Sequence, residues 1–309
     1  MHLSKSIYFF SMIILLVFTN CKTSQKANGS AANNIPETEN ALLWQISKKG
    51  LATDSYLFGT IHIIDEADYF LPKQTLTSFD KADRVIFEIN MEDMTDMSQM
   101  MAIIPKTFMN NGVTLGDLLG EEDYTFVKAH FEEMGLPIFM LEKMKPMFLS
   151  VFAGGGGLDP QDLMNGSMKS YETELFEMGK AQGKTFAGLE TIDFQISVFD
   201  SIPYEDQAQM LVESIKAGDT GNDEFKETVA IYKKQDLKAM VAMVEGNEEY
   251  SEYEDILLTK RNKAWIPLIE KAMTEKSNFF AVGAAHLGGK NGVVYLLRKA
   301  GYTLTPLSL

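Results

Sequence analysis

Short apolar runs flanked by turn residues predict strands near both ends of the chain. They lie in residues 41–47, 55–64, 83–90, 184–189, 279–282 and 302–307. Between them, apolar residues recur at three- and four-residue steps, which predicts helices. These helices lie in residues 76–82, 114–134, 141–153, 170–182, 193–217, 223–244, 251–275 and 293–300. The pattern predicts one domain with strands at both ends and a helical middle.

Two of the predicted strands end in the same motif, a glycine followed three residues later by a histidine. LFGTIH carries Gly59 and His62, and VGAAH carries Gly283 and His286. A histidine at the end of a strand lies on the rim of a sheet, where open α/β sheets bind ligands. Imidazole there can bind a metal or transfer protons near neutral pH. A core histidine bonded to a backbone carbonyl explains either motif alone, but the matched pair favours a functional site.

Two acidic residues occupy comparable positions. Glu88 interrupts the apolar strand VIFEIN, where a buried carboxylate needs a cation or a hydrogen-bond partner. Glu190 follows Gly188 in TFAGLET, at the end of another strand. The alternatives are an edge-strand residue that faces solvent for Glu88 and a helix N-terminal acid for Glu190. Both are candidate site residues.

The predicted helix over residues 251–275 carries Arg261 and Asn262 ahead of Trp265. On a buried side, such an arginine steadies a carboxylate or an oxyanion, whereas on an exposed side it only ends a salt bridge. The sequence leaves both alternatives open.

Two segments have an unusual composition. Residues 91–109 are rich in methionine, which favours an adaptable core or lid helix, with a pliable groove for peptides or other apolar ligands as the alternative. Residues 154–157 are four consecutive glycines. No Gly-Lys-Ser/Thr follows them, so they predict a hinge or a helix end and not a phosphate-binding loop.

The N-terminus predicts an exported protein. Residues 1–20 contain Lys5 and an apolar run shorter than a bilayer span, so they predict a signal peptide. Cys21, the single cysteine, follows at the position of a bacterial lipoprotein processing site, which predicts a lipid anchor in the cell envelope. Residues 21–41 then form a flexible tether, and residues 42–309 form the folded domain. The alternative is an ordinary exported protein with a free thiol.

Acidic residues outnumber basic ones, with 43 Asp and Glu against 28 Lys and Arg and a formal net charge of −15. Such a field repels phosphate backbones and argues against nucleic acid as a partner. It also argues against binding to an anionic membrane surface beyond the lipid anchor. A cation is the more natural companion.

Taken together, the motifs resemble the TraB/GumN family, whose animal relatives include the Tiki proteases. The matching stretches occur in the family's order and span nearly everything after Leu42. They are LFGTIH (57–62), VIFEIN (85–90), KSYETELFEMGKAQGKTFAGLET (169–191), LLTKRNKAW (257–265) and FFAVGAAHLGGKNGVVYLLRKAGYTLTPL (279–307).

The resemblance implies a single α/β domain with a central mixed sheet, in which both Gly-x-x-His motifs meet at one cleft. In the Tiki branch this cleft is associated with a divalent cation such as manganese or cobalt and with hydrolysis of peptide bonds. The family's site residues correspond to His62 and His286 for the paired histidines, Glu88 for the strand glutamate, Glu190 for the Leu-Glu-Thr acid, and Arg261 with Asn262 for the Arg-Asn pair.

The chain departs from the family pattern at one acid. Where many members have Gly-x-Asp, this sequence has Ser170, Tyr171 and Glu172. The acid is kept in a longer form, which leaves its contact open.

These inferences predict a hydrolase that acts on peptides or proteins. His62, His286 and Glu88 are the predicted ligands of a divalent metal, which is Mn, Co or Zn. Glu190 is either the general base or a partner that orients a histidine, and Arg261, beside Asn262, faces the developing oxyanion. In a metal-free alternative, His62 or His286 is the base and Glu88 orients it.

Two alternatives come from other classes. One is a lipid-anchored binding protein whose histidines hold haem or a metal, which requires a wide apolar slot and tolerates the loss of both acids. The other is a regulator that sequesters a peptide without cutting it. The catalytic prediction requires Glu88 or Glu190 to lie within water-bridging reach of the histidines.

Overall fold

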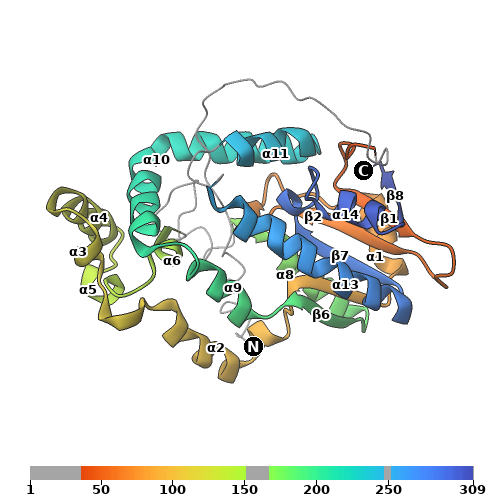
Figure 1. Cartoon of the computed structure of the whole chain (residues 1–309), viewed down its shortest axis with the longest axis horizontal. Helices are drawn as coiled ribbons and strands as arrows, with labels where there is room; N and C mark the ends of the chain where they lie inside the picture. Colours follow the sequence, from red (N-terminus) through yellow and green to blue (C-terminus); the bar gives the residue numbers. More distant parts are fainter. Residues whose placement is uncertain (1–35, 151–166, 247–251, 309) are drawn as a thin grey trace.

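A six-stranded sheet in the order β6-β4-β7-β2-β1-β8 forms the centre of the fold (Figure 1). The structure is a computed structural model, and it describes residues 36–150, 167–246 and 252–308, without the side chains of residues 217–222 and 245. The strands are β1 (Leu43–Ser47), β2 (Ser55–Thr60), β3 (Ile63–Asp65), β4 (Arg84–Ile89), β5 (Met168–Ser170), β6 (Thr185–Glu190), β7 (Asn278–Gly283) and β8 (Thr303–Leu307).

Strands β2 and β7 come from opposite ends of the chain and pair in parallel, with Gly59 opposite Val282 and Thr60 opposite Gly283. Every residue of both strands is buried. Because the carboxyl ends of parallel strands meet at one edge of a sheet, the two Gly-x-x-His motifs emerge side by side. A Cβ on Gly59 would lie only 3.0 Å from the Ala284 Cβ, so glycine permits the turn after β7 to approach β2.

The remaining strands make the sheet mixed. Strand β4 pairs in parallel with both β7 and β6, and Ile89 lies opposite Glu190. Strands β1 and β8 extend the other side of the sheet with antiparallel pairing, and β3 pairs with β5 in a separate two-stranded sheet. Since β4 is an interior strand, the alternative of a solvent-facing Glu88 on an edge strand is wrong.

Helices cover the sheet and extend beyond it. The α-helices are α1 (Lys73–Lys81), α2 (Met97–Ile103), α3 (Leu115–Leu118), α4 (Glu121–Glu133), α5 (Ile138–Leu141), α6 (Pro146–Ser150), α8 (Tyr171–Ala181), α9 (Ile192–Phe199), α10 (Tyr204–Lys233), α11 (Leu237–Gly246), α13 (Lys260–Glu275) and α14 (Val293–Lys299). Short 3₁₀ turns are η2 (Asp93–Thr95), η3 (Ile104–Thr107), η4 (Asn110–Gly112) and η6 (Ala284–His286), and η5 (Asp255–Thr259) is a π-helix. Helices α13 and α14 pack together on the face of the sheet that is turned to the viewer in Figure 1.

A second, smaller core lies outside the sheet, in the helical part drawn at the left of Figure 1. We call this part the helical lobe; it contains α3, α4, α5, α6 and the first half of α10. Its buried residues are Leu115, Val127, Phe131, Ile138, Leu149, Leu211, Val212 and Ile215. Further along α10, Phe225, Val229 and Tyr232 belong to the sheet core, so this helix joins the two cores.

The predicted fold class is confirmed, since one mixed sheet is built from strands at both ends of the chain with helices between them. Several predicted boundaries are wrong. The strand expected over residues 55–64 is divided into β2 and β3, and the helix expected over 114–134 is divided into α3 and α4. Conversely, helices were expected to stop near residue 217 and restart near 223, but α10 runs unbroken from Tyr204 to Lys233. Gly218 and Gly221 inside the helix cost about 1 kcal/mol each, and the packing of α10 into both cores outweighs this cost.

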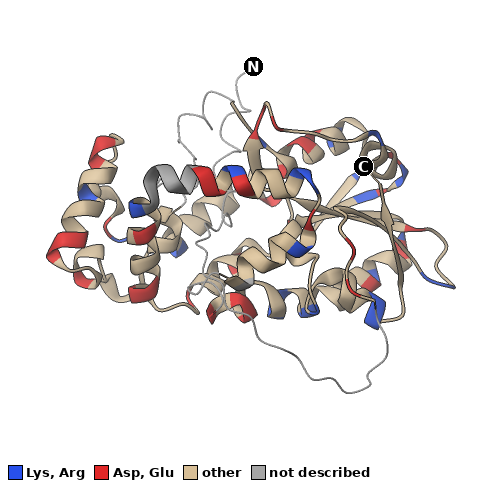
Figure 2. Ribbon diagram, turned by 90° about the horizontal axis from the view of Figure 1, so that it is seen from above, with Lys and Arg blue, Asp and Glu red and all other residues tan. Residues whose placement is uncertain are grey.

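Several sequence predictions lie outside the described residues, namely the signal peptide over residues 1–20, lipidation of Cys21, most of the tether over residues 21–41, and the glycines at 154–157. In the ranges that the structure covers, no helix combines the length and the apolar character needed to cross a bilayer. Acidic and basic residues are mixed along the helices of the helical lobe and along those around the sheet (Figure 2).

Candidate functional site

Glu88 in β4 belongs to a buried cluster of ion pairs. Its Oε2 accepts a hydrogen bond from Arg261 Nη2 at 2.7 Å, and its Oε1 accepts one from the backbone N–H of Gly283 at 2.8 Å. Arg261 also donates to Glu190, from Nε and from Nη2, both at 2.9 Å. The side chain of Arg261 is only 1% exposed, so the pairing satisfies a charge that is removed from water.

Two more side chains complete the hydrogen bonding of these carboxylates. Gln195 Nε2 donates to Glu88 at 3.1 Å and to Glu190 at 3.4 Å. Trp265 Nε1 donates to Glu190 at 2.8 Å. Both oxygens of Glu190 are therefore occupied, and among the described residues it makes no hydrogen bond to either histidine.

His286, at the end of η6, is held by Asn262. Its Nδ1 lies 2.6 Å from Asn262 Oδ1, while Asn262 Nδ2 donates to the carbonyls of His286 and Asn291 at 3.4 and 2.9 Å. Since the amide nitrogen faces carbonyls, its oxygen accepts, and His286 Nδ1 carries the proton. The unprotonated Nε2 then lies 3.7 Å from Glu88 Oε1 and 3.3 Å from Arg261 Nη1.

His62, in the turn after β2, is held by a carboxylate instead. Its Nδ1 lies 3.0 Å from Glu172 Oε1, and the same oxygen accepts a hydrogen bond from Thr60 Oγ1 at 2.6 Å. Ser170 Oγ donates to the other oxygen of Glu172 at 3.3 Å. The contact of Glu172, which the sequence left open, is therefore with His62.

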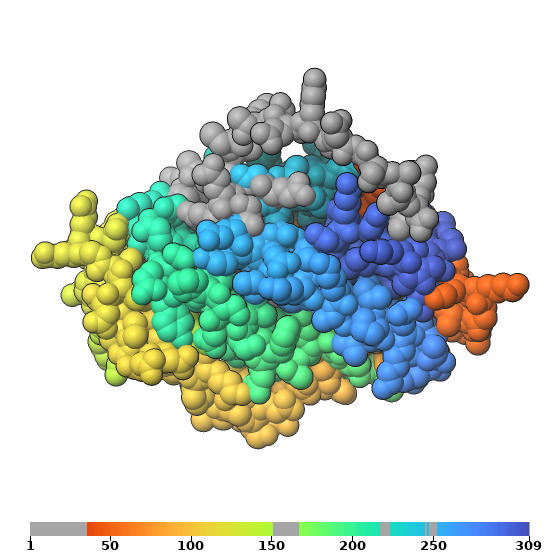
Figure 3. Space-filling model, in the orientation of Figure 1, coloured from red at the N-terminus to blue at the C-terminus, as the bar shows by residue number. Residues whose placement is uncertain are grey.

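The two histidines and Glu88 converge beside Gly283. A Cβ built on Gly283 would lie 3.3 Å from Glu88 Oε1, 3.3 Å from His62 Nε2 and 3.6 Å from His286 Cδ2. Glycine at this position leaves room between the three side chains. His62 is the most exposed of them, at 14% against 8% and 3% for Glu88 and His286, so solvent reaches the cluster on the His62 side. In the space-filling view, the blue atoms of the segment that contains α13 and α14 lie at the centre and right of the face turned to the viewer, with green, teal and yellow segments beside them (Figure 3).

The matched histidines have opposite proton affinities. Burial works against a charged His62, but the Glu172 carboxylate outweighs it and raises the pKa of His62 to about 9. Burial dominates at His286 and lowers its pKa to about 3; Glu88 opposes the shift, whereas Arg261 adds to it. At neutral pH, His62 without a metal is a cation and His286 is neutral.

Glu88 stays ionised in spite of its burial. Burial favours the protonated form, but His286, Arg261, His62 and the Gly283 N–H together hold the pKa of Glu88 well below its ordinary value. The cluster therefore keeps a carboxylate at the point where both Nε2 atoms face.

A π-helix turn aims Arg261 and Asn262 into the cluster. The π-helix η5 precedes α13, and the side chain of Arg261 donates from Nη1 to the carbonyl of Leu257 in η5 at 3.0 Å. Arg261 and Asn262 are consecutive, yet both are buried, at 1% and 2% exposure. Single π turns inside helices are frequent at functional sites, where they shift the direction of side chains.

The cluster has the donors and the charge for a divalent cation. Both Nδ1 atoms are held by oxygen acceptors, an arrangement that orients metal-binding imidazoles and leaves Nε2 as the donor. With both imidazoles neutral, three carboxylates (Glu88, Glu172 and Glu190) and one guanidinium leave two negative charges, which a divalent cation would balance.

The present arrangement is nevertheless not a finished metal site. No group of three or more His, Cys, Asp and Glu side chains in the described ranges is placed to hold a metal ion. Arg261 Nη1 lies against His286 Nε2 and occupies the donor side of that imidazole. The residue types and the net charge of the cluster suit a divalent metal. The side chains, however, are not arranged around a common point as metal ligands.

All six predicted cluster residues, His62, His286, Glu88, Glu190, Arg261 and Asn262, are brought together. Sequence reasoning missed Gln195 and Trp265 as partners of the carboxylates and Thr60 as a partner of Glu172. Trp265 follows Arg261 by four residues on α13, and that helical spacing was the available signal. Gln195 had no such signal, because Glu190 ends β6 and Gln195 lies in α9.

The methionine-rich segment 91–109 is only partly helical and contains η2, α2 and η3. Met91, Met94 and Met109 are buried, but they lie outside α2, so the expected core helix is not borne out for the α-helical part of the segment. Met97 and Met101 are exposed, at 71% and 60%. His130, the remaining described histidine, lies on α4 in the helical lobe, next to Phe131.

The chain is therefore an α/β domain in which two imidazoles and a carboxylate lie at the carboxyl ends of parallel strands, beside a buried arginine from α13. The model of the TraB/PrgY/gumN family matches residues 42–306, and the chain belongs to this family.

Curated relatives are animal proteins at low identity. The chain is 23% identical to "Metalloprotease TIKI1" of Danio rerio over 94% of this chain and 67% of the relative. It is 22% identical to "Metalloprotease TIKI2" of Danio rerio over 85% of this chain and 60% of the relative, and 22% identical to "Metalloprotease TIKI1" of Homo sapiens over 96% and 68%. The chain thus spans about two thirds of the length of these relatives. No solved structure matches.

Proposed function

We propose that the chain is a divalent-metal-dependent hydrolase of peptide bonds. The observation that supports it is the convergence of His62 Nε2, Glu88 Oε1 and the His286 ring beside Gly283, with each imidazole oriented from behind by an oxygen acceptor. The relatives named metalloproteases favour the same class of reaction.

His62, His286 and Glu88 are the residues that would hold the metal. A bound divalent cation, Mn, Co or Zn, would lower the pKa of a bound water and polarise the scissile carbonyl. Other residues of the chain orient the two imidazoles. Glu172 and Asn262 fix the direction in which each Nε2 faces, and both need only retain their present hydrogen bonds.

Arg261 and Glu190 have complementary parts in the proposal. Arg261 Nη1 carries the positive charge nearest to His286 Nε2, so it is the group that stabilises negative charge on a reacting carbonyl oxygen. Glu190, with both oxygens occupied by Arg261, Trp265 and Gln195, positions the arginine and is not free to take a proton from water. Neither predicted role of Glu190, the general base or the partner that orients a histidine, fits these contacts.

The location of the protein belongs to the same proposal. A signal peptide over residues 1–20 and a lipid on Cys21 would hold the domain at the membrane of the bacterial cell envelope, where exported peptides and proteins are available as substrates. Metabolic labelling with a palmitate analogue tests this part, and Cys21→Ser is expected to lose the label.

The central test separates metal binding from cleavage. Glu88→Gln removes one charged donor, so metal affinity is expected to fall at least about tenfold, with loss of cleavage of a peptide library. Metal content is measured by mass spectrometry, and cleavage is measured separately. Glu92→Gln is the control because Glu92 lies just beyond the same strand and is exposed. Full cleavage by the Glu88→Gln variant, or by chelated wild-type protein, would refute the proposal.

The haem-binding alternative is less well supported. A cavity of about 590 Å³ lies in the described part of the molecule, but neither His62 nor His286 lines it. It therefore offers no slot in which both histidines would hold a haem.

A further inference from the structure

Helix α2 carries methionine thioethers at the surface that the histidine cluster does not use. Met97 and Met101 are 71% and 60% exposed, and Met100 is partly buried against the sheet core. The helix lies at the lower edge of the molecule in Figure 1. Side chains as exposed as Met97 and Met101 gain little from core packing, so packing does not explain the choice of methionine at both positions.

The three methionines share one side of the helix. Helix α2 runs from Met97 to Ile103, and Met100 and Met101 follow Met97 by three and four residues. Residues at these spacings are neighbours on a helix surface, with Cβ atoms roughly 5–6 Å apart. Methionine has three rotatable bonds in its side chain, so three sulfurs that start this close together can reach one shared point beside the helix.

Thioether sulfur is a soft and uncharged donor. Soft sulfur ligands select ions such as Cu(I), whereas Mg(II), Ca(II) and Mn(II) prefer carboxylate, carbonyl and water oxygens. A thioether does not have to lose a proton before it binds a metal, unlike a thiol or an imidazolium. Three thioethers on one side of α2 therefore favour a soft monovalent cation and not the divalent metal considered for the histidine cluster.

The charges around the first turn of α2 also favour a cation. Asp96 caps the helix, and its Oδ1 accepts hydrogen bonds from the Ser98 hydroxyl at 2.6 Å and the Ser98 N–H at 2.8 Å, which lower the pKa of its carboxyl. Asp93 adds a second carboxylate, which accepts a hydrogen bond from Gln99 Nε2 at 3.4 Å. Residues 91–105 contain no Lys, Arg or His. The carboxylates offset the positive end of the helix dipole, so this turn does not repel a bound cation.

We propose that Met97, Met100 and Met101 form a binding site for Cu(I). The two exposed thioethers are open to an ion from solvent, and Met100, which packs against the sheet core, holds the third donor in a more fixed position. The site uses no residue of the histidine cluster. It is a binding site that goes beyond the proposed hydrolase activity and does not depend on it.

An apolar contact surface is the competing explanation for the exposed methionines. Ile104 and Phe108 follow α2 in the chain and are 46% and 36% exposed, so exposed apolar side chains continue beyond the helix. A contact surface of this kind needs apolar area, whereas a copper site needs sulfur. Replacing methionine by leucine keeps the first property and removes the second, so this substitution separates the two explanations.

The first test uses the full-length chain with Cys21→Ser, so that no thiolate competes for a soft ion. Ag(I) is the probe, because it is a soft ion of the same charge as Cu(I) and needs no protection from air. NMR of isotope-labelled methionine methyl groups follows each thioether. The resonances of Met97, Met100 and Met101 are expected to shift together and to saturate at one ion per chain, and Mg(II) is expected to leave them unchanged. Unshifted resonances with Ag(I), or equal shifts with Mg(II), would overturn the proposal.

The second test measures copper itself and removes the donors. Competition with a colorimetric Cu(I) chelator in the absence of oxygen gives the affinity of the chain for Cu(I). The double variant Met97→Leu and Met101→Leu keeps the apolar surface but loses two sulfurs, so its affinity for Cu(I) and Ag(I) is expected to fall at least about tenfold. Unchanged affinity in this variant would support the apolar contact surface instead, and binding of Ag(I) without binding of Cu(I) would contradict the copper assignment.

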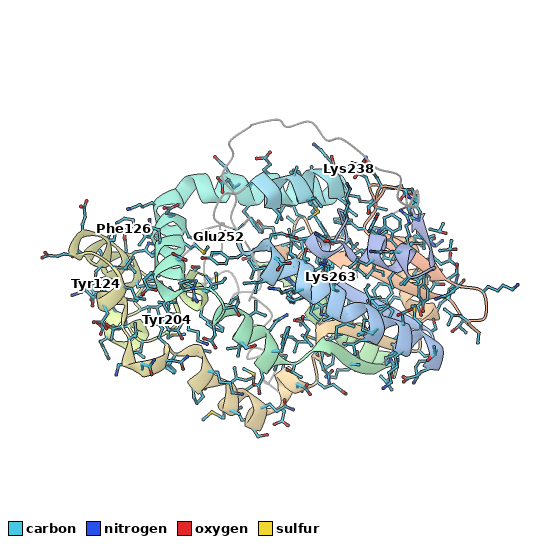
Figure 4. The ribbon with its side chains drawn as sticks, in the orientation of Figure 1. Tyr124, Phe126, Tyr204, Lys238, Glu252 and Lys263 are labelled. Atoms are coloured by element: carbon cyan, nitrogen blue, oxygen red, sulfur yellow. The ribbon has the colours of Figure 1, made fainter. Side chains whose placement is uncertain are left out.

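Met140→Leu is the matched control. Met140 is 63% exposed, but it is the single methionine of α5, so its thioether has no partner on the same helix. Helix α5 belongs to the helical lobe, which lies to the left of α2 in Figure 4, where Tyr124 and Phe126 of α4 are labelled. The control is expected to bind Ag(I) and Cu(I) as tightly as the parent chain. A loss equal to that of the double variant would show that any exposed methionine binds the ion, and the site on α2 would be refuted.

Discussion

The two Gly-x-x-His turns share a sequence pattern and a sheet edge, yet they present their histidines in opposite charge states. His62 has a carboxylate behind it and some contact with solvent, whereas His286 has an amide behind it and a guanidinium in front. The pKa of the first is raised to about 9 and that of the second is lowered to about 3. A motif therefore fixes where an imidazole lies, but the partner supplied by a distant element decides what that imidazole does.

The largest effect is expected from breaking the charge cluster that separates the two turns. Arg261→Met leaves Glu88 and Glu190 buried without their cation, which is expected to cost about 3–5 kcal/mol of unfolding free energy. Urea unfolding measures the loss. Lys260→Met is the control, since Lys260 is exposed and its pair with Asp255 is worth less than about 1 kcal/mol. A similar small loss in both variants would show that the cluster is not what holds these carboxylates.

The free energy of unfolding of the metal-free protein is expected to depend on pH in opposite ways through His62 and His286. His62 has a folded-state pKa above 6.5, so its stabilisation is fully present below pH 6.5 and is lost as the pH rises through about 9. The loss is roughly 3 kcal/mol. His286 has a folded-state pKa below 6.5, so it lowers stability as the pH falls from 6.5 toward about 3.

Exchanging the partners tests the cause of that difference. Glu172→Gln is expected to lower the pKa of His62 and flatten the alkaline loss, and Asn262→Asp is expected to raise the pKa of His286. Titration of the histidine ring resonances by NMR, in the presence of a chelator, measures both. If Glu172→Gln leaves the pKa of His62 near 9, the carboxylate is not the cause of the shift.

The smallest effects are expected at the two matched glycines. In Gly59→Ala, the new Cβ meets Ala284 and Leu287 at 3.0 Å, which is expected to cost about 1–3 kcal/mol. In Gly283→Ala, the Cβ meets side chains of the cluster at 3.3 Å, so we expect less than about 1 kcal/mol but a weaker affinity for metal.

Thermal unfolding and metal titration distinguish the two glycine variants. Gly120→Ala, where a Cβ meets nothing within 4 Å, is the control. Equal metal affinity in the wild type and the Gly283→Ala variant would remove Gly283 from the site.

Much of the site could be predicted because its residues lie at strand ends. The apolar runs located β2, β4, β6 and β7, and a parallel sheet brings their carboxyl ends to one edge. His62, Glu88, Glu190 and His286 follow from that rule alone. Their convergence required no knowledge of the helices.

The remaining contacts depend on how helices dock, which local patterns do not encode. Gln195 reaches Glu88 only because α9 turns back over the sheet edge. Glu172 reaches His62 because β5 pairs with β3, and neither short strand has a recognisable pattern of its own. The continuity of α10 was not predicted for a similar reason, since the helix is stabilised by packing into two different cores.

The position of β7 between β2 and β4 has a consequence for synthesis. A chain that leaves the ribosome amino end first carries His62, Glu88 and Glu190 long before the strand that must fit between them is translated. Because such distant pairing is slow and closes the sheet late, a prematurely terminated chain has no assembled cluster. The reactive groups are thus kept apart until the last part of the protein has been made.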